Sequence, residues 1–418
     1  MVACPASLVL LAGACFAAPL VAADDAYYIS LPAEGAIYRL DATSGVMTPF
    51  VTGLGIPFYG AWSTTDGMLY MPDRLLGIVL RITPEGGASL FAAGGWLDSP
   101  VAVVQAPDGG LMAADIFTRT VVRLSATGQQ TLVFDDAGAG GLLDSPGGIA
   151  YAPDGTLYVA NNLSNTVVAI DEAAHTIAVA CDSPLLSGPG GLVADGSGNL
   201  FVANYGSSAI VRIRLDTGAA EVFCNDPFLD EPNDLRLAHD GGLLVTMENS
   251  ALGRIDALGQ LTVISQAPEL GAFDGVASPA DSPPCDGAYL PYGTGTAGSA
   301  GAVPELRGIF SPCAGAAVAI DFTGFLGNAA GALAWGIAPA DLPFKGSRLL
   351  VSIGPPGGLI PLPFPGSGPG GGALRLSFAL PGDPAIAGLD FYLQGLAVDP
   401  GAAGGISASN GLREHIGG

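Results

Sequence analysis

The sequence has very little positive charge. Its 418 residues include 14 Lys and Arg against 38 Asp and Glu, giving a formal net charge of −24. Nucleic acids and anionic membranes would repel such a chain, which argues against both as partners. The acidic excess is compatible with cation binding and, more simply, with solubility in an extracellular medium. Lys345 is the only lysine, so no Schiff-base or phosphate-loop lysine precedes it.

Long hydrophobic runs are also missing, apart from one at the N-terminus. Residues Ser7 to Leu20 are apolar, and the small residues Val21-Ala22-Ala23 follow them. This pattern is typical of a secretory signal peptide and predicts one over residues 1–23. The run is too short for a transmembrane helix, and no later run is longer. We therefore expect a protein that is secreted or held at the cell surface, without a transmembrane segment.

Turn-forming residues, in contrast, are abundant and periodic. The dipeptide Asp-Gly occurs at Asp66, Asp108, Asp154 and Asp240, at spacings of 42, 46 and 86 residues, and Gly196-Ser197-Gly198-Asn199 fills the double gap. Asp-Gly between alternating apolar runs is a strong hairpin signal. Each repeat contains four short strand-like runs, and four-stranded units of about 40–45 residues are typical of β-propeller blades.

Counting the repeats predicts how the ring closes. The second strand of a blade recurs six times, near Tyr28, Tyr70, Met112, Tyr158, Phe201 and Leu244. The first repeat has no inner strand before it, whereas Phe273 to Ala277 is an inner strand without a blade after it. A shared blade that combines both ends removes exposed sheet edges. We predict an all-β fold with a six-bladed β-propeller over residues 24–281, closed by this shared blade.

The remainder predicts a second, smaller β domain. A Gly/Pro/Ser/Thr-rich linker is expected over residues 282–304, and an antiparallel β-sandwich-like domain over 305–418. The strand-like runs that support the sandwich are Ala317–Ile320, Ser347–Val351, Leu374–Phe378 and Phe391–Gln394.

Four cysteines follow the predicted leader. Cys285 and Cys313 flank the start of the second domain and are the preferred disulfide pair in an oxidising compartment. Cys181 and Cys224 occupy equivalent positions near the outer edges of successive blades. Their Cα atoms are expected to be more than about 7 Å apart, so we predict two free thiols.

The repeat motif also resembles a known family. Ser145–Asn161 and Gly188–Asn204 carry the pattern P-x-G-[IL] followed by L-[YF]-V-A-N. Over roughly residues 24–280 the chain resembles NHL repeats and the related senescence-marker-protein/gluconolactonase propellers. The run Gly388–Leu412 resembles C-terminal modules of exported bacterial proteins.

The gluconolactonase resemblance implies a divalent cation, usually calcium, in the central channel, bound by one Glu, two Asn and one Asp. Asn233 and Asp274 match one Asn and the Asp, whereas Val101 and Gly190 stand where the Glu and the other Asn are expected. With a cation bound, Asp274 or Asp234 would orient water as the general base for lactone hydrolysis. Polar residues that only cap the inner strands are the alternative interpretation of these positions.

The sequence lacks the residues that other kinds of catalysis would need. The three histidines form no H-E-x-x-H motif, and none is expected in the channel, where a zinc-dependent lyase of the propeller type would need them. We find no G-x-S-x-G motif either. Asp73, Asp115, Asn161 and Asn204 follow the second strands of successive blades, where short polar side chains usually cap tight turns.

Two functions therefore remain. One is a non-catalytic exported propeller that binds a protein, a glycan or a surface component. The other is a gluconolactonase-like, calcium-dependent lactone hydrolase that uses Asn233, Asp234 and Asp274. The first is favoured because the fold is complete while the catalytic set is not.

Overall fold

The computed structural model describes residues 26–238, 242–278 and 287–417, and the regular secondary structure of these residues is almost all β-strand. Those up to residue 278 belong to one compact unit and those from residue 287 to another. The predicted leader, residues 1–23, lies outside the described residues. Within the part of the chain that is described, no helix is long and apolar enough to cross a membrane.

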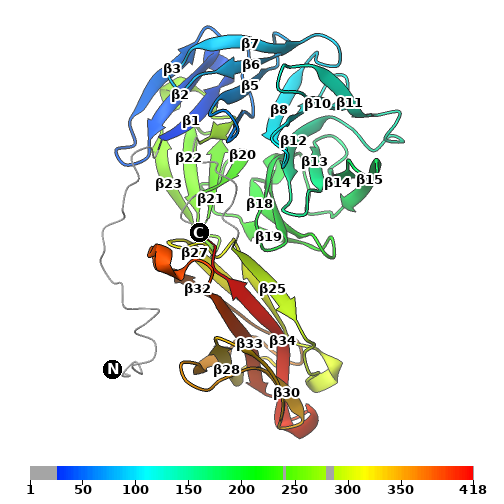
Figure 1. Ribbon diagram of the computed structural model, residues 1–418, viewed down its shortest axis with the longest axis vertical. Coiled ribbons are helices and arrows are strands. Elements are labelled where there is room, and N and C mark those ends of the chain that lie inside the picture. The colour runs from blue at the N-terminus through cyan, green and yellow to red at the C-terminus, as the bar shows by residue number, and fades with distance from the viewer. Residues whose placement is uncertain (1–25, 239–241, 279–286, 418) are drawn as a thin grey trace. The chain divides into compact units, whose positions relative to one another are not determined.

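The first unit contains six four-stranded antiparallel sheets arranged around a common centre (Figure 1). The first three sheets, from the inner to the outer strand, are β24, β1, β2, β3 (Val276–Ala277, Ala26–Leu31, Ala36–Asp41, Met47–Thr52); β4, β5, β6, β7 (Ala61–Trp62, Leu69–Asp73, Ile78–Ile82, Ala88–Ala93); and β8, β9, β10, β11 (Pro100–Gln105, Leu111–Asp115, Thr120–Leu124, Gln130–Asp135). The other three are β12, β13, β14, β15 (Pro146–Tyr151, Leu157–Asn161, Thr166–Asp171, Thr176–Cys181); β16, β17, β18, β19 (Pro189–Ala194, Asn199–Asn204, Ala209–Arg214, Ala220–Cys224); and β20, β21, β22, β23 (Pro232–Leu237, Leu243–Met247, Ala251–Ile255, Leu261–Gln266).

This is the predicted propeller, and its strands follow from local sequence. In the fourth sheet Gly155 adopts a φ of +86°, which favours glycine, and Asp154 Oδ1 accepts a hydrogen bond from Thr156 N at 2.9 Å. The second strand β13 is buried throughout, whereas the outer strand β15 is half exposed. Packing between neighbouring sheets stabilises the ring, as in the buried cluster that contains Val121 and Phe134 of the third sheet and Leu157 of the fourth.

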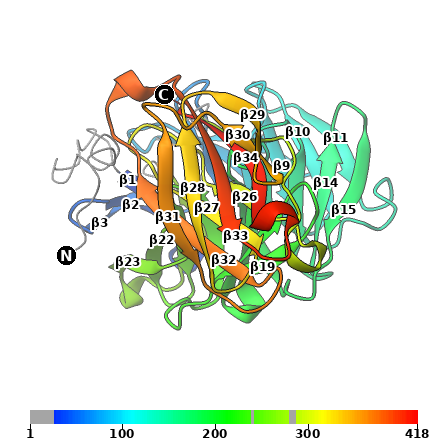
Figure 2. The same ribbon diagram turned by 90° about the horizontal axis from the view of Figure 1, so that it is seen from below.

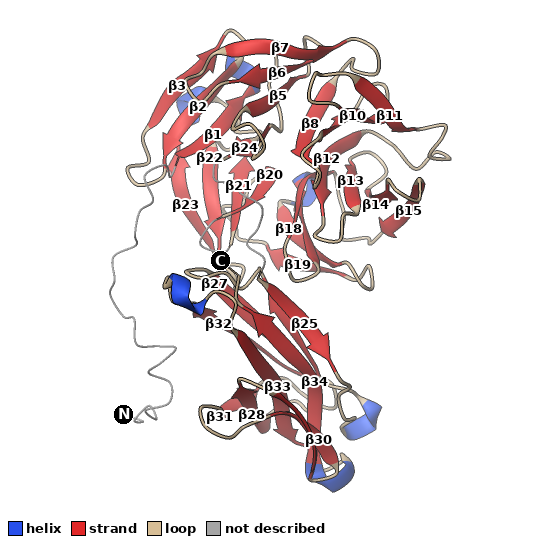
Figure 3. Ribbon diagram, viewed as in Figure 1, coloured by secondary structure: helices blue, strands red, loops and turns tan. Residues whose placement is uncertain are grey.

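The shared sheet has the predicted composition. Strand β24, from the end of the unit, pairs with β1, from its beginning, through Tyr28 with Ala277 and Ile29 with Val276 (Figure 3). Because β24 covers the edge of β1, neither strand is left with an unpaired edge toward the other.

One end of the propeller, which we call the mouth face, is formed by the turns after the second strands and the loops before the inner strands. Buried polar side chains tie these turns and loops together. Asp115 accepts hydrogen bonds from Asp98 N and Ser99 N of the loop, at 2.8 and 2.7 Å, and from Phe117 N and Thr118 N of the turn, at 3.0 and 2.9 Å. Asp73, Asn161 and Asn204 make equivalent bonds in their own blades, so the predicted capping role is confirmed.

The second unit is a sandwich of antiparallel sheets, as predicted. Its larger sheet has the order β25, β34, β33, β28, β31 (Ala288–Tyr292, Ile406–His415, Asp390–Val398, Ala329–Gly336, Gly358–Phe364), its smaller sheet the order β26, β27, β32 (Glu305–Ile309, Ala317–Phe325, Gly372–Ala379), and β29 pairs with β30 (Pro339–Phe344, Ser347–Val351) (Figure 2). The two sheets share one core, in which the rings of Phe325 and Phe364 stack with their centroids 4.0 Å apart.

The predicted linker requires a correction. Strand β25 lies within residues 282–304 and pairs with β34 from Ala288–His415 to Tyr292–Gly411. Its Tyr289 is buried in the sandwich core, so these residues belong to the second domain. The Gly and Pro content of the stretch concealed one short strand whose partner lies more than a hundred residues away.

The cysteines follow the prediction where the structure describes them. Cys181 and Cys224 are free and buried at the ends of β15 and β19. Cys313 is disulfide-bonded, whereas its predicted partner Cys285 lies outside the described residues.

A buried acid in the second domain makes its stability depend on pH. Glu414 in β34 is 3% exposed, and burial raises its pKa to about 7, although Tyr289 Oη donates a hydrogen bond to it at 3.0 Å. The unfolded chain releases this proton near pH 4.3, whereas the folded protein retains it up to about pH 7. The stability of the domain therefore falls as the pH rises from about 4 to about 7 and stays lower above that.

We therefore expect Glu414→Gln to be more stable than the wild-type protein at pH 8, by up to about 3 kcal/mol, with the difference shrinking toward pH 4. Urea unfolding followed by Trp335 fluorescence, with Trp62 and Trp96 replaced by Phe, measures this domain. Equal differences at pH 4 and pH 8 would contradict the prediction.

Candidate binding site at the mouth of the propeller channel

The inner strands approach one another closely at the mouth face. Four of the six, β8, β12, β16 and β20, begin with a bulge in their pairing, as between Pro189 and Leu192 and between Pro232 and Leu235. A Cβ atom on Gly191 would lie 2.3 Å from Asp234 Oδ1, which leaves room only for glycine there. Neighbouring inner strands are therefore tightly packed where the predicted site residues gather.

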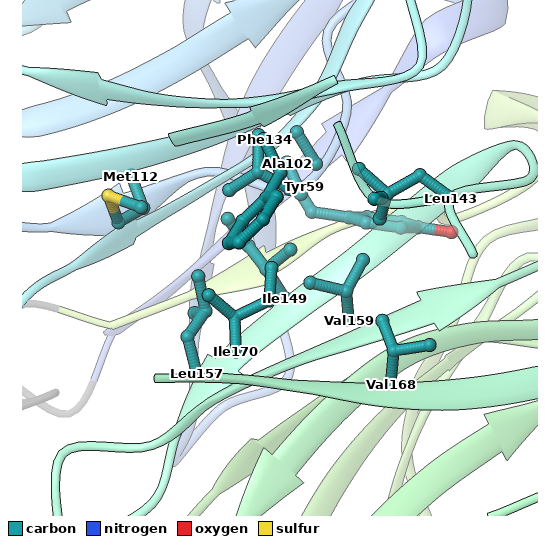
Figure 4. Close-up of a cluster of buried hydrophobic side chains, with 13 residues drawn as sticks. Tyr59, Ala102, Met112, Phe134, Leu143, Ile149, Leu157, Val159, Val168 and Ile170 are labelled. Atoms are coloured by element: carbon teal, nitrogen blue, oxygen red, sulfur yellow. The ribbon is translucent and has the colours of Figure 1, made fainter. Parts of the chain in front are cut away.

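Two long side chains connect the inner strands of different sheets at the mouth face. Tyr59, which precedes β4, is 7% exposed and packs in the cluster that contains Ala102 and Ile149 (Figure 4). A Cβ atom on Gly190, in the fifth sheet, would lie 3.5 Å from Tyr59 Oη, so the hydroxyl extends to the position where a second Asn ligand was expected. Arg236 Nη2 donates a hydrogen bond to Gly60 O at 2.9 Å and so joins the sixth sheet to the second.

Asp234 belongs to the same group of contacts, because it pairs with Arg236. Its side chain is 1% exposed, Oδ1 pairs with Arg236 Nη1 at 3.1 Å, and Oδ2 accepts a hydrogen bond from Val276 N at 3.2 Å. Burial raises the pKa of Asp234, and the adjacent Arg236 opposes that rise. Both oxygens are engaged and inaccessible, so this carboxylate connects β20 to β24 and to Arg236. It therefore cannot orient water for a substrate.

Asp274 differs from Asp234 in having no such partners. It is 9% exposed, and within the described residues no hydrogen bond or ion pair to its carboxylate is present. Burial, followed by the charges of Glu248 and Asp234, raises the pKa of Asp274 to about 7. Its backbone is fixed, because Ser30 O accepts from Asp274 N at 3.1 Å and Asp274 O accepts from Thr246 Oγ1 at 2.5 Å.

Asn233 and Glu248 lie beside Asp274. Asn233 is 5% exposed, and its Nδ2 donates to Phe273 O at 3.3 Å and to Glu248 Oε1 at 3.5 Å. Glu248 follows strand β21 and is half-buried. The predicted residues Asn233 and Asp274 are thus brought together, and Glu248 adds a second carboxylate that the sequence analysis did not assign.

The rim of the site contains two further groups. Tyr205, which follows β17, is half-buried, and burial together with a hydrogen bond to Glu231 raises its pKa to about 12, with further contributions from Glu248 and Asp274. Arg74, which follows β5, is exposed and lies over the ring of Phe58, with its guanidinium carbon 5.6 Å from the ring centroid.

These residues do not fit the expected calcium site. Calcium takes six to eight oxygen ligands. Of the four expected ligand positions, Val101 is apolar and Gly190 has no side chain, and the amide nitrogen of Asn233 is directed at Glu248. Among the residues that the structure describes, no group of three His, Cys, Asp or Glu side chains is placed to hold a metal ion.

A simple signal in the sequence marks the residues that were missed. The position directly after the second strand is occupied by Arg74, Tyr205 and Glu248 in the second, fifth and sixth sheets. Tyr59 stands at the second residue after Pro57, where Gly148 and Gly191 follow Pro146 and Pro189. Aligning the repeats position by position would have placed these side chains around the mouth.

The comparisons with known proteins agree with the fold. No family model matches the chain, and no curated protein matches it. Among solved structures, the chain is similar to a chain of the nidogen/laminin complex, with a TM-score of 0.53, 17% identity, and coverage of 60% of this chain and 97% of that one. It is also similar to virginiamycin B lyase from Staphylococcus aureus, with a TM-score of 0.49, 17% identity, and coverage of 62% and 90%.

At these identities the likeness concerns the fold alone. The matched shares are consistent with the propeller unit being the part that these structures have in common with the chain.

Proposed function

We propose that this protein is an exported, non-catalytic propeller that binds a protein partner through its mouth face. The observation that carries the proposal is a band of exposed apolar side chains on the turns of three successive blades. Leu75 and Leu76 are 66% and 56% exposed, Phe117 is 76% exposed and Leu163 is 67% exposed. Contiguous exposed apolar surface marks interaction sites on soluble proteins.

Loops on the same face extend this band. Trp96, Leu185 and Phe228 are 41%, 37% and 37% exposed. Their carbonyl groups accept hydrogen bonds from Thr118, Asn204 and Asn249 in the adjacent turns, so the loops and turns form one surface. Aromatic residues are enriched where proteins bind one another.

The turns at the opposite end provide an internal contrast. They connect strands of the same blades but consist largely of Asp, Gly and Thr, as at Asp66-Gly67, Asp108-Gly109 and Thr217-Gly218, although Val46 and Leu258 are exposed there, at 55% and 39%. Tight turns of this kind need no Leu or Phe. The large apolar residues on the mouth face are therefore unexplained by turn formation, which supports a binding role.

The gluconolactonase-like alternative receives less support. The resemblance to gluconolactonase propellers needs four ligands, whereas Val101 and Gly190 stand at two of these positions and Tyr59 extends to the second of them. Asp234, one of the two candidate general bases, is paired with Arg236. The resemblance of residues 388–412 to modules of exported bacterial proteins supports the export part of the proposal.

The test uses random 12-residue peptides displayed on phage and selected on the full-length mature chain. We expect selected peptides to bind Leu75→Ser/Phe117→Ser at least about tenfold more weakly, because burial of each apolar side chain contributes about 1.5–3 kcal/mol. Fluorescence polarisation with the synthetic peptides measures this.

The matched control is Leu90→Ser/Val179→Ser, which removes two exposed apolar side chains from the outer strands β7 and β15. It should leave the affinity unchanged. Selection of no peptide above background, or an equal loss in the control variant, would overturn the proposed function.

A further inference from the structure

Asp274 is an unusual residue for the interior of a protein. Buried carboxylates are normally paired or hydrogen-bonded, since removing a charge from water is costly. Asp234 on β20 follows this rule, because it pairs with Arg236 and accepts a hydrogen bond from Val276 N. Asp274 is nine-tenths buried at the mouth, and no donor contacts its carboxylate among the described residues.

The groups facing Asp274 leave an excess of negative charge. Burial and the charges of Glu248 and Asp234 raise the pKa of Asp274, and Arg74 lowers it by a smaller amount. Asp234 is compensated by Arg236, and Arg74 is exposed over Phe58. Tyr59 and Tyr205 both sense the charges of Asp274 and Glu248, which raise the pKa of each hydroxyl.

We propose that the mouth of the channel receives a Lys or Arg side chain from the protein partner, with Asp274 and Glu248 as its counter-charges. The inference rests on the proposed function and names what the partner must carry: a basic residue flanked by apolar residues that pack on Leu75, Phe117 and Leu163. The acidic mouth and the apolar band lie on the same face, so one segment can contact both.

The donor set suits an ammonium or guanidinium group better than a metal ion. A lysine ammonium group has three hydrogens to donate and no fixed geometry. Two carboxylates and the Tyr205 hydroxyl at the rim provide acceptors of the required kind. Calcium takes six to eight oxygen ligands, whereas these three side chains offer five at most.

The peptide selection described above also tests this inference. We expect the selected sequences to share a Lys or Arg next to apolar residues, and Asp274→Asn to weaken their binding at least tenfold. Replacing the basic residue of the peptide by norleucine should cause a similar loss, and the two changes together should cost little more than either alone. Asp182→Asn removes an exposed charge from another loop of the same face and should have no comparable effect.

The pH dependence separates a direct contact from a structural role. Asp274 must lose its proton to pair with a cation, so affinity should rise between pH 6 and pH 8 in the wild-type chain. The Asp274→Asn variant should lose most of this rise. Since Asn is isosteric and uncharged, the variant keeps the backbone hydrogen bonds of residue 274 and should stay folded.

The other outcomes are distinct. Peptides that require Leu75 and Phe117 but lack a basic residue and ignore Asp274→Asn would overturn this inference and leave the proposed function standing. Selection of no peptide would overturn both. If calcium chloride alone raises the melting temperature of the full chain, and Asp274→Asn abolishes the shift, the mouth binds a metal ion and the inference fails.

Discussion

Replacing Asp115 by Ala should destabilise the propeller by about 3–5 kcal/mol. Four backbone N–H groups donate to this carboxylate, and the side chain is completely buried. Removing the acceptor leaves these donors without their partner, and each buried unsatisfied donor costs about 1–3 kcal/mol before the structure relaxes. Partial relaxation and water entry keep the total below the simple sum.

Urea unfolding of a Trp335→Phe background measures the effect, because the remaining tryptophans, Trp62 and Trp96, both lie in the propeller. The control is Asp154→Ala, which removes an exposed turn residue with one backbone hydrogen bond and should cost less than about 1 kcal/mol. If the two variants unfold at the same urea concentration, the tie between turn and loop contributes no special stability.

The fold of the propeller could be predicted because its determinants are local. Asp154-Gly155 and its equivalents fix each hairpin within four residues, and the apolar runs on either side have the length of one strand. Closure followed from counting, since an unmatched inner strand near Val276 required an unmatched first blade. None of these steps needed knowledge of a distant contact.

The strand β25 was missed for the opposite reason. Its five residues, Ala288–Tyr292, lie in Gly-rich sequence and contain Pro291, which weakens any strand pattern. The strand exists because β34, more than a hundred residues later, pairs with it, and because Tyr289 is buried against the core. Tertiary packing decided this element against its local sequence.

In the site, too, local sequence predicted some features, whereas long-range contacts decided others. Asn233 and Asp274 were predicted as neighbours because the repeat places them at equivalent positions, where the loops enter the inner strands, and Asp234 directly follows Asn233. The different environments of Asp234 and Asp274 were not predictable, since they depend on Arg236, which contacts Gly60 across 176 residues of sequence. Contacts across a ring join positions of different blades, and repeat alignment alone does not reveal which side chains fill the centre.

The ion pair at the centre leads to the second large effect. Arg236→Met should destabilise the propeller by about 3–5 kcal/mol at pH 8, because it leaves the carboxylate of Asp234 buried without its counter-charge. Asp234→Asn in the same background should recover much of this loss, since it removes the charge and keeps an oxygen for Val276 N. The same urea experiment in the Trp335→Phe background measures both.

The dependence on pH gives the sharper test. Burial already raises the pKa of Asp234, and without Arg236 it rises further, so the folded variant holds a proton that the unfolded chain releases. Its stability must then fall as pH rises above about 4, and Arg236→Met should cost more at pH 8 than at pH 5. Arg81→Met, which breaks a pair with Asp66 at the surface, should cost less than about 1 kcal/mol. Equal costs for the two arginines would mean that the Asp234–Arg236 pair contributes no special stability. The contrast between the paired Asp234 and the unpaired Asp274, on which the proposed role of Asp274 depends, would then be lost.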